Sequence, residues 1–169
     1  MQPVLIAGQW RPSIGTESFT AVNPQTREPL TERYPVSPWG EVETALMSAA
    51  AAFTIVRDWP GERFAEFLQR YADEIEARAD ALVAAAHAET GLPVQPRLQG
   101  AELPRTTNQL RQAASAARDG SWALSTIDTK ANIRSRHAPL GPVAVFGPNN
   151  FPIAFNSIAG GDFAAAAAA

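Results

Sequence analysis

Residues 139–152 read Pro-Leu-Gly-Pro-Val-Ala-Val-Phe-Gly-Pro-Asn-Asn-Phe-Pro, and this stretch decides the fold class. Its apolar run 142–146 is bounded by glycines, a pattern typical of a strand that is buried on both faces of a parallel sheet. The sharp turn 147–150 follows, and residues 151–169 have helical potential. A strand, a glycine turn and a helix begin a βαβ unit, so the sequence predicts an α/β protein.

The first sixty residues predict a small hairpin followed by a helix. The β-prone stretches 4–6 and 18–22 are separated by glycines and a proline, which suggests that they pair with each other. A helix is expected over 37–53, with Ser37 as its cap and Pro38 at its first position. The apolar residues that should face a core are Val42, Ala45, Leu46, Ala49 and Phe53.

Two further helical regions are predicted before the strand. The stripe over 64–91 indicates one long amphipathic helix or two in tandem, and 97–118 repeats the pattern with Pro104 expected to kink or restart the helix. The stripe residues are Phe64, Phe67, Leu68, Tyr71, Ile75, Leu82 and Val83 in the first region, and Leu98, Leu103, Leu110 and Ala114 in the second. The period then changes to two, so 122–138 is expected to form a strand pair or a protruding arm.

The stretch 139–152 resembles the aldehyde dehydrogenase superfamily, whose members carry a Pro-x-Gly-x-x-x-x-x-x-Pro-x-Asn-Phe-Pro signature. Further similar segments, in family order, are Ile6-Ala-Gly-Gln-Trp10, Asn23-Pro24, the Ala-rich helix that ends in Phe53, and Glu89-Thr90-Gly91. The resemblance covers essentially the whole chain. It implies an α/β fold, namely the amino-terminal part of an aldehyde dehydrogenase-like Rossmann-type domain. In that domain, helices precede the first buried parallel strand and part of a β oligomerisation arm is present.

The same resemblance implies three divisions of the chain. Residues 1–119 would be the amino-terminal hairpin and helical part of the cofactor-binding domain, and residues 120–140 the strands of the oligomerisation arm. Residues 141–169 would supply the first strand, the active-site turn and the helix of a truncated cofactor-binding sheet. The family precedent also implies a homodimer or homotetramer.

The turn and the segment after it suggest a branch of the superfamily. Phe-Gly-Pro-Asn-Asn-Phe-Pro followed by Ile158-Ala-Gly-Gly-Asp162 looks most like the NADP-preferring and α-ketoglutaric semialdehyde (2,5-dioxovalerate) dehydrogenases. The resemblance therefore implies NAD(P)-dependent oxidation of an aldehyde, such as this semialdehyde, to the carboxylic acid through a thiohemiacetal and a thioester. The expected cofactor is NADP or NAD.

Asn150 maps onto the family residue whose side-chain amide donates to the oxyanion formed by the aldehyde oxygen. The cofactor-binding residues that the resemblance implies, beside the nicotinamide, are Phe146, Gly147, Pro148 and Asn149. Many family members have Trp where Asn149 stands, so contacts made by that ring are not expected here. Without the resemblance, the favoured interpretation is that Asn149-Asn150 only tolerates unusual backbone angles in a turn, and the resemblance reverses this for Asn150 but not for Asn149.

Composition excludes several classes of function. With 14 Lys plus Arg against 17 Asp plus Glu, and with the basic residues scattered along the chain, no nucleic-acid or anionic-membrane partner is expected. The partner that the resemblance implies is a small-molecule aldehyde substrate. Neither a signal peptide nor a membrane span is visible, so a cytoplasmic location is expected. The isolated histidines His87 and His137 give no metal site.

The chain contains no cysteine, although the family nucleophile is Cys. Together with the six alanines at 164–169, this predicts an incomplete subunit that is inactive by itself. Arg105 and Arg111 are both candidate anchors for an acidic substrate, and neither is preferred. The alternative hypothesis is a non-catalytic helical interaction module that docks a partner through its apolar stripes.

Overall fold

The computed structural model describes residues 1–169, and the contacts within it define two units. Unit 1 consists of Met1–Asp58 with Ala88–Gly91, and unit 2 consists of Trp59–His87 with Leu92–Ala169. No helix in the structure has the length and apolar character needed to cross a membrane.

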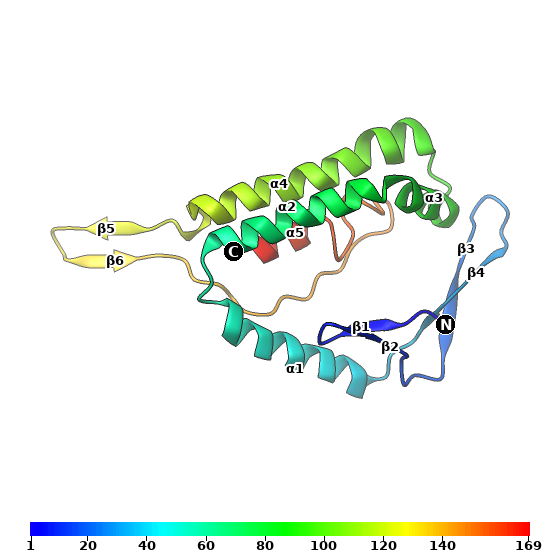
Figure 1. Cartoon of the computed structure of the whole chain (residues 1–169), viewed down its shortest axis with the longest axis horizontal. Helices are drawn as coiled ribbons and strands as arrows, with labels where there is room; N and C mark the ends of the chain where they lie inside the picture. Colours follow the sequence, from blue (N-terminus) through cyan, green and yellow to red (C-terminus); the bar gives the residue numbers. More distant parts are fainter. The chain divides into compact units, whose positions relative to one another are not determined.

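Unit 1 contains two antiparallel hairpins, each formed by neighbouring segments of the chain (Figure 1). Strand β1 (Val4–Ile6) pairs with β2 (Gln9–Arg11), and β3 (Ser18–Val22) pairs with β4 (Pro29–Pro35). The expected pairing of 4–6 with 18–22 is therefore wrong. The reason is the tight turn after β1, whose two residues both have positive φ and so let the chain reverse at once.

Helix α1 (Trp39–Val56) follows the hairpins. The predicted cap is corrected: Pro38 is the N-cap, and no side chain caps the helix. The Ser37 hydroxyl instead bonds to the buried carboxylate of Glu41, which also accepts a hydrogen bond from the Ser13 hydroxyl at 2.5 Å. The bond from Ser13 is the main reason that the pKa of Glu41 lies below its usual value.

The apolar stripe of α1 does not face a core. Val42 and Leu46 remain 36% and 48% exposed. Within unit 1 the helix packs against β1, and a three-residue strand is too short to cover the stripe.

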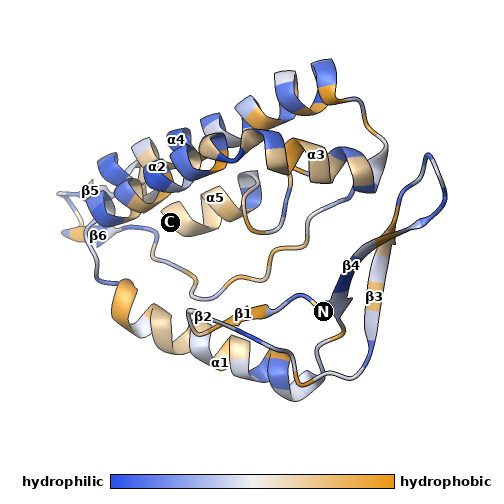
Figure 2. Cartoon of the chain, turned by 45° about the vertical axis from the view of Figure 1, so that its right-hand side comes forward, coloured by the Kyte–Doolittle hydropathy of each residue, from blue (hydrophilic) through white to orange (hydrophobic).

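Unit 2 is built on two long helices that pack side by side, α2 (Gly61–Ala77) and α4 (Leu103–Asp119), with α5 (Gly161–Ala168) against both (Figure 1). Helix α3 (Ala79–Thr90) continues α2 after a break, and the irregular helical segment η1 (Val94–Glu102) leads into α4. Two tandem helices are thus confirmed, and Pro104 lies at the start of α4 rather than inside it. Figure 2 shows hydrophilic and hydrophobic residues alternating along α2 and α4, whereas α5 is largely hydrophobic.

The core of unit 2 contains all four predicted residues of the second stripe. Its buried apolar side chains are Ala65, Leu68, Ala72, Ile75, Val83, Leu98, Leu103, Leu110, Ala114, Ile153 and Ala164. On α2 the buried face differs in part from the predicted one. Leu68 and Ile75 are buried as expected, but Ala65 and Ala72 fill the rest of that face, where aromatic side chains were expected. Phe67 is 51% exposed and stacks on Tyr71 instead.

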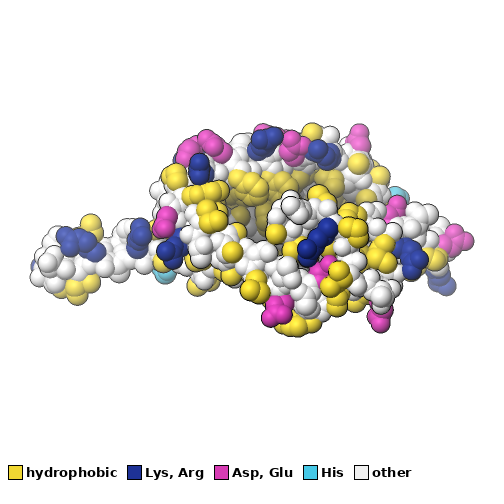
Figure 3. All heavy atoms as spheres, turned by 60° about the horizontal axis from the view of Figure 1, so that its bottom comes forward, with side chains coloured by type: hydrophobic (Ala, Val, Ile, Leu, Met, Phe, Trp, Pro, Cys, Tyr) yellow, Lys and Arg dark blue, Asp and Glu magenta, His cyan; other side chains and the backbone are white.

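A hairpin of β5 (Thr126–Asp128) and β6 (Ile133–Ser135) projects from the helices of unit 2 as a narrow arm (Figure 3). The short helical turn η2 (Ser121–Ala123) precedes it. The expected strand pair within 122–138 is therefore confirmed, except that Trp122 lies in η2. All six strand residues are exposed. A role of this arm in pairing subunits stays a prediction.

The run 142–146 does not form the expected buried strand. Residues 139–148 are without regular structure, with Val143 54% and Phe146 90% exposed. A buried parallel strand needs a neighbouring strand, and each sheet of the structure consists of only two antiparallel strands, neither of which pairs with 142–146. The helical potential after it is realised only from Gly161, because residues 151–160 form successive turns.

Candidate active-site turn

The candidate site is the turn 146–150 together with the turns 151–160 that hold it on unit 2. The backbone N–H of Gly147 donates to the Ser157 hydroxyl at 2.8 Å. A Cβ atom at Gly147 would lie 2.4 Å from the carbonyl oxygen of Phe155, so this close approach requires glycine. The turn and the segment after it are therefore packed against each other.

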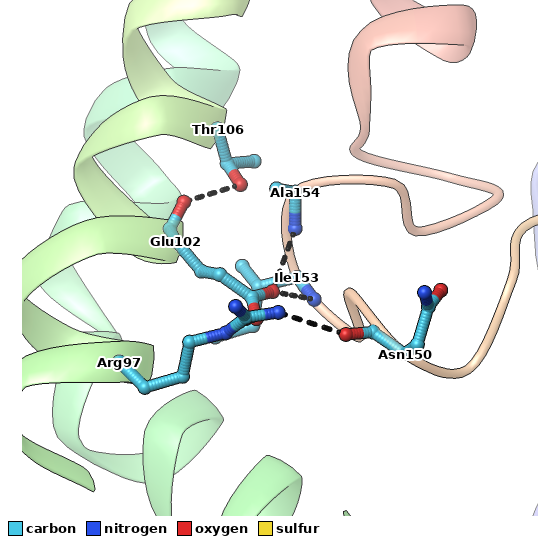
Figure 4. Close-up of polar contacts among 6 residues, drawn as sticks. All are labelled: Arg97, Glu102, Thr106, Asn150, Ile153 and Ala154. Carbon is cyan, nitrogen blue, oxygen red and sulfur yellow. Dashed lines mark hydrogen bonds and ion pairs between the residues drawn. The ribbon is translucent and has the colours of Figure 1, made fainter. Parts of the chain in front are cut away.

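The segment that follows the turn is anchored by a buried carboxylate. Glu102, at the end of η1, is 2% exposed. Its Oε2 accepts hydrogen bonds from the backbone N–H of Ile153 at 3.1 Å and of Ala154 at 3.3 Å (Figure 4). The Thr106 hydroxyl donates to the Glu102 carbonyl at 2.9 Å, one helical turn later. Glu102 thus joins the start of α4 to the chain that carries the turn.

Arg97 completes this anchor. Its Nε lies 2.8 Å from Oε1 of Glu102, and its Nη2 donates to the backbone carbonyl of Asn150 at 2.9 Å. The guanidinium carbon also lies 4.1 Å from the centre of the Phe151 ring, within the range of a cation–π contact. One side chain therefore contacts the buried carboxylate and two successive residues of the site.

The side chain of Asn150 is left free by these contacts. Only its backbone carbonyl is bonded, and its amide points away from Arg97 and Glu102 in Figure 4. The residue is exposed, so its amide N–H groups are available to an oxygen outside the chain. The role of Asn150 as oxyanion donor stays a prediction.

The residues predicted to lie beside the cofactor, 146–149, form one exposed stretch. Phe146 presents almost its whole ring, and Pro148 and Asn149 are exposed next to it. Such a surface can contact a flat ring such as nicotinamide, so the residues fit that end of a dinucleotide. The chain contains no glycine-rich phosphate loop, so this turn offers nothing for the phosphates.

The two candidate anchor arginines differ in their surroundings. Arg111 is bound to Glu76 at 2.6 and 2.8 Å and to Asp73 at 2.8 Å, and its hydrogen bonds are the main reason that the pKa of Glu76 falls to about 2. Arg105 has no carboxylate within ion-pair distance. Its guanidinium lies 4.8 Å from the centre of the Phe155 ring and 5.9 Å from that of Phe151. Arg105 is therefore the uncompensated cation next to the turn.

The remaining residues singled out from the sequence have structural surroundings. His87 Nδ1 lies 2.6 Å from the Leu92 carbonyl, and His137 is an exposed residue after the arm. Gly160 is buried, and a Cβ there would lie 2.7 Å from backbone atoms of Phe155 and Asn156, so this glycine permits close packing of the backbone.

Arg97 and Glu102 were not expected as site residues. A signal existed: Glu102 and Thr106 continue the four-residue spacing of the buried residues Leu98 and Leu110. A carboxylate on the buried side of a helix requires partners there, which points to a polar anchor.

Comparison with known proteins identifies the relatives of this chain. The model of the aldehyde dehydrogenase family matches residues 10–169. The α-ketoglutaric semialdehyde dehydrogenase 2 of Azospirillum brasilense is 45% identical over 93% of this chain and 31% of its own length. The α-ketoglutaric semialdehyde dehydrogenase of Acinetobacter baylyi is 36% identical over 97% of this chain and 32% of its own length.

Solved structures agree with these relatives. HpcC from Thermus thermophilus superposes with a TM-score of 0.82 at 24% identity over 97% of this chain and 31% of its own chain. PnpE in complex with nicotinamide adenine dinucleotide superposes with a TM-score of 0.82 at 25% identity, over 99% of this chain and 34% of its own. The chain spans about a third of the length of the proteins it matches. It has the fold of the corresponding third of those proteins, and it belongs to the aldehyde dehydrogenase family.

Proposed function

We propose that this chain is the amino-terminal third of a subunit that oxidises an acidic semialdehyde, such as α-ketoglutaric semialdehyde, with NADP or NAD. The observation that carries the proposal is the 45% identity to a semialdehyde dehydrogenase across nearly the whole chain. In the net reaction the aldehyde and one water molecule give the carboxylate and two protons, and one hydride passes to the oxidised nicotinamide.

Asn150 supplies the electrostatic part of this chemistry. When a nucleophile adds to the aldehyde carbon, the carbonyl oxygen becomes negative, and an amide N–H held ready for it lowers the barrier by about 3–4 kcal/mol. The free side chain of Asn150 on an anchored backbone supports this role. The family resemblance implies a cysteine nucleophile, and because this chain has no cysteine, that residue would come from another part of the complete protein.

Phe146, Gly147, Pro148 and Asn149 would contact the nicotinamide end of the cofactor. The bound cofactor would supply the hydride acceptor, and the chain's own contribution is to orient the ring and to exclude water on one side of it. The exposure of these residues next to Asn150 supports the assignment.

Arg105 is the residue we propose to favour an acidic substrate. It lies over the two phenylalanines that follow Asn150, and no carboxylate of the chain neutralises it. Arg111 is unsuitable, because Glu76 and Asp73 already bind its guanidinium. A planar guanidinium binds a carboxylate through two parallel hydrogen bonds, which suits the far end of a semialdehyde acid.

The subunits would pair through the β5–β6 arm as a homodimer or homotetramer in the cytoplasm. The arm supports this because its strands are exposed and each has one unpaired edge. The alternative function, a helical docking module, is not favoured. The stripes that would dock a partner place Leu68, Leu98 and Leu110 fully inside the chain's own core.

The test is steady-state oxidation of a panel of aldehydes by the full-length protein with NAD and with NADP. We expect the highest kcat/KM for a semialdehyde that carries a carboxylate, compared with an uncharged aldehyde of the same length. We expect Asn150→Ala to lower kcat by roughly 100- to 1,000-fold, with the KM for the cofactor nearly unchanged. Wild-type turnover by Asn150→Ala would remove this residue from the mechanism, and no turnover of any aldehyde by the wild type would refute the proposed activity.

A further inference from the structure

We propose that Arg97 and Glu102 are positioning residues that set the place of the Asn150 side chain by fixing the backbone on both sides of Phe151-Pro152. The inference rests on the proposed function of Asn150. Neither side chain would touch the substrate, since both act through the main chain of the turn.

The two residues hold the segment 150–154 at its two ends. Arg97 binds the carbonyl of Asn150, and Glu102 binds the N–H groups of Ile153 and Ala154. The ring of Pro152 fixes one backbone angle between these points. With both ends held and φ of Pro152 fixed, the peptide plane that follows the Cα of Asn150 has little freedom left, which fixes the point from which its side chain starts.

The two anchors are joined into one network. The Nε of Arg97 is 2.8 Å from Glu102 while its Nη2 is 2.9 Å from Asn150, so the same guanidinium sets both distances. The contact between the guanidinium and the Phe151 ring holds its plane as well. A displacement of the carboxylate would therefore displace the turn.

The chemistry of the pair favours positioning over simple packing. The equivalent places one turn before and two turns after Glu102 are Leu98 and Leu110, both fully buried and apolar. An apolar side chain at 102 would fill the same space without the cost of burying a carboxylate. The ionic group adds directional hydrogen bonds to two chosen amides, which an apolar side chain cannot provide.

The rate of the reaction should depend on how accurately the Asn150 amide is placed, because catalytic sites tolerate only small displacements of a hydrogen-bond donor. A donor must lie within about 0.5 Å of its productive position, and a misplacement of about 1 Å can lower the rate about 100-fold. Arg97 is the better residue to change, because its side chain is 33% exposed and its loss should leave the core intact. We expect Arg97→Met in the full-length protein to lower kcat by roughly 10- to 100-fold, with the KM for the cofactor unchanged.

A double-mutant cycle on the full-length protein tests whether Arg97 acts through Asn150. If it does, Arg97→Met has no further effect on kcat once Asn150 is replaced by Ala. Equal loss in both backgrounds, or no loss in the single variant, would overturn the proposal. The matched control is Arg118→Met, which removes another salt bridge of unit 2, that with Glu62, and should leave kcat unchanged.

Amide hydrogen exchange tests, without any activity measurement, whether Arg97 and Glu102 hold the backbone of residues 150–154. In Glu102→Ala the amides of Ile153 and Ala154 should exchange at least 10-fold faster, and in Arg97→Met the acceleration should be smaller but confined to 150–154. The amide of Leu110 in the core should keep its rate in Arg97→Met. Unchanged exchange at Ile153 and Ala154 in both variants would refute the anchor, whereas a fully active Asn150→Ala would refute the proposed role of Asn150 and leave the anchor to be judged by exchange.

Discussion

Replacing Glu102 by alanine removes the acceptor of two buried backbone amides, those of Ile153 and Ala154. Each amide left without a partner costs about 1–3 kcal/mol, which gives about 2–6 kcal/mol for the pair. Removing one partner of a buried ion pair typically lowers the free energy of unfolding by about 3–5 kcal/mol, a range that overlaps the first. Because Arg97 is partly exposed and can turn to water, we expect a middle value of about 4 kcal/mol.

Such a loss is large compared with the whole free energy of unfolding, which is about 5–15 kcal/mol for a typical domain. It can be measured on the 169-residue chain by urea titration followed by circular dichroism, because most helical residues belong to unit 2. The control is Glu62→Ala, which removes a carboxylate from a salt bridge with Arg118 whose partners are 52% and 51% exposed. That exposed pair should contribute little to stability, because solvent screens it.

The two variants make the same chemical change in the same unit, so the difference between them isolates burial and the two amides. Glu102→Gln separates these effects further, because its amide oxygen can still accept from Ile153 and Ala154 while its NH2 group opposes Arg97. We expect its loss of stability to lie between those of the other two variants. A loss for Glu102→Ala as small as that for Glu62→Ala would refute the reasoning that Glu102 anchors the turn.

Three more predictions concern charge and packing. The pKa of Glu76 is about 2 in the folded chain and near 4.5 in the unfolded chain, so its pair with Arg111 stabilises the fold above pH 4.5 and loses this contribution as the pH falls towards 2. Because Glu76 is 44% exposed, the contribution should be at most about 1 kcal/mol. Measured between pH 4.5 and 2, the fall in Tm should be smaller for Arg111→Met than for the wild type. Gly160→Ala should destabilise by about 1–3 kcal/mol in thermal unfolding because its Cβ would meet backbone atoms at 2.7 Å, whereas Gly40→Ala, with open space around it, should not destabilise. Arg105→Met in the full-length protein should raise KM for a semialdehyde acid about 10-fold or more and leave KM for an uncharged aldehyde unchanged, a difference that steady-state kinetics would measure; an equal rise for both aldehydes would contradict an anchoring role.

The helices of unit 2 could be predicted from the sequence because the patterns that indicate them, the spacing of apolar residues and the position of a proline, are local. The stripe Leu98, Leu103, Leu110 and Ala114 is buried as its spacing indicates, and Pro104 begins α4 because a proline is tolerated in the first turn of a helix. The β5–β6 arm follows from a period of two between turn residues in the same way. Each of these elements is stabilised within a few turns or by its neighbour in sequence.

Elements that need a distant partner were less predictable. The run 142–146 has the composition of a buried strand, but composition cannot supply the neighbouring strand that its hydrogen bonds require. The predicted pairing of 4–6 with 18–22 was wrong for a different reason. A two-residue turn after β1 reverses the chain at once, so β1 pairs with β2 instead of β3. For β1 and β3 the strand residues were predicted correctly and only the pairing was wrong, whereas 142–146 does not form a strand at all.

The site shows the same division between local and distant information. Asn150 and the turn 146–149 are recognised by a contiguous motif, which contains no information about what holds them. Their anchor, Arg97 and Glu102, lies about 50 positions earlier and is identified only when Oε2 of Glu102 is seen next to the amides of Ile153 and Ala154. A motif thus predicts which group would meet the substrate, whereas the side chains that hold the backbone next to that group come from elsewhere in the chain. Because Glu102 lies in a buried helix stripe that also contains Leu98 and Leu110, searching buried stripes for a single carboxylate is a physical way to find such anchors in related chains.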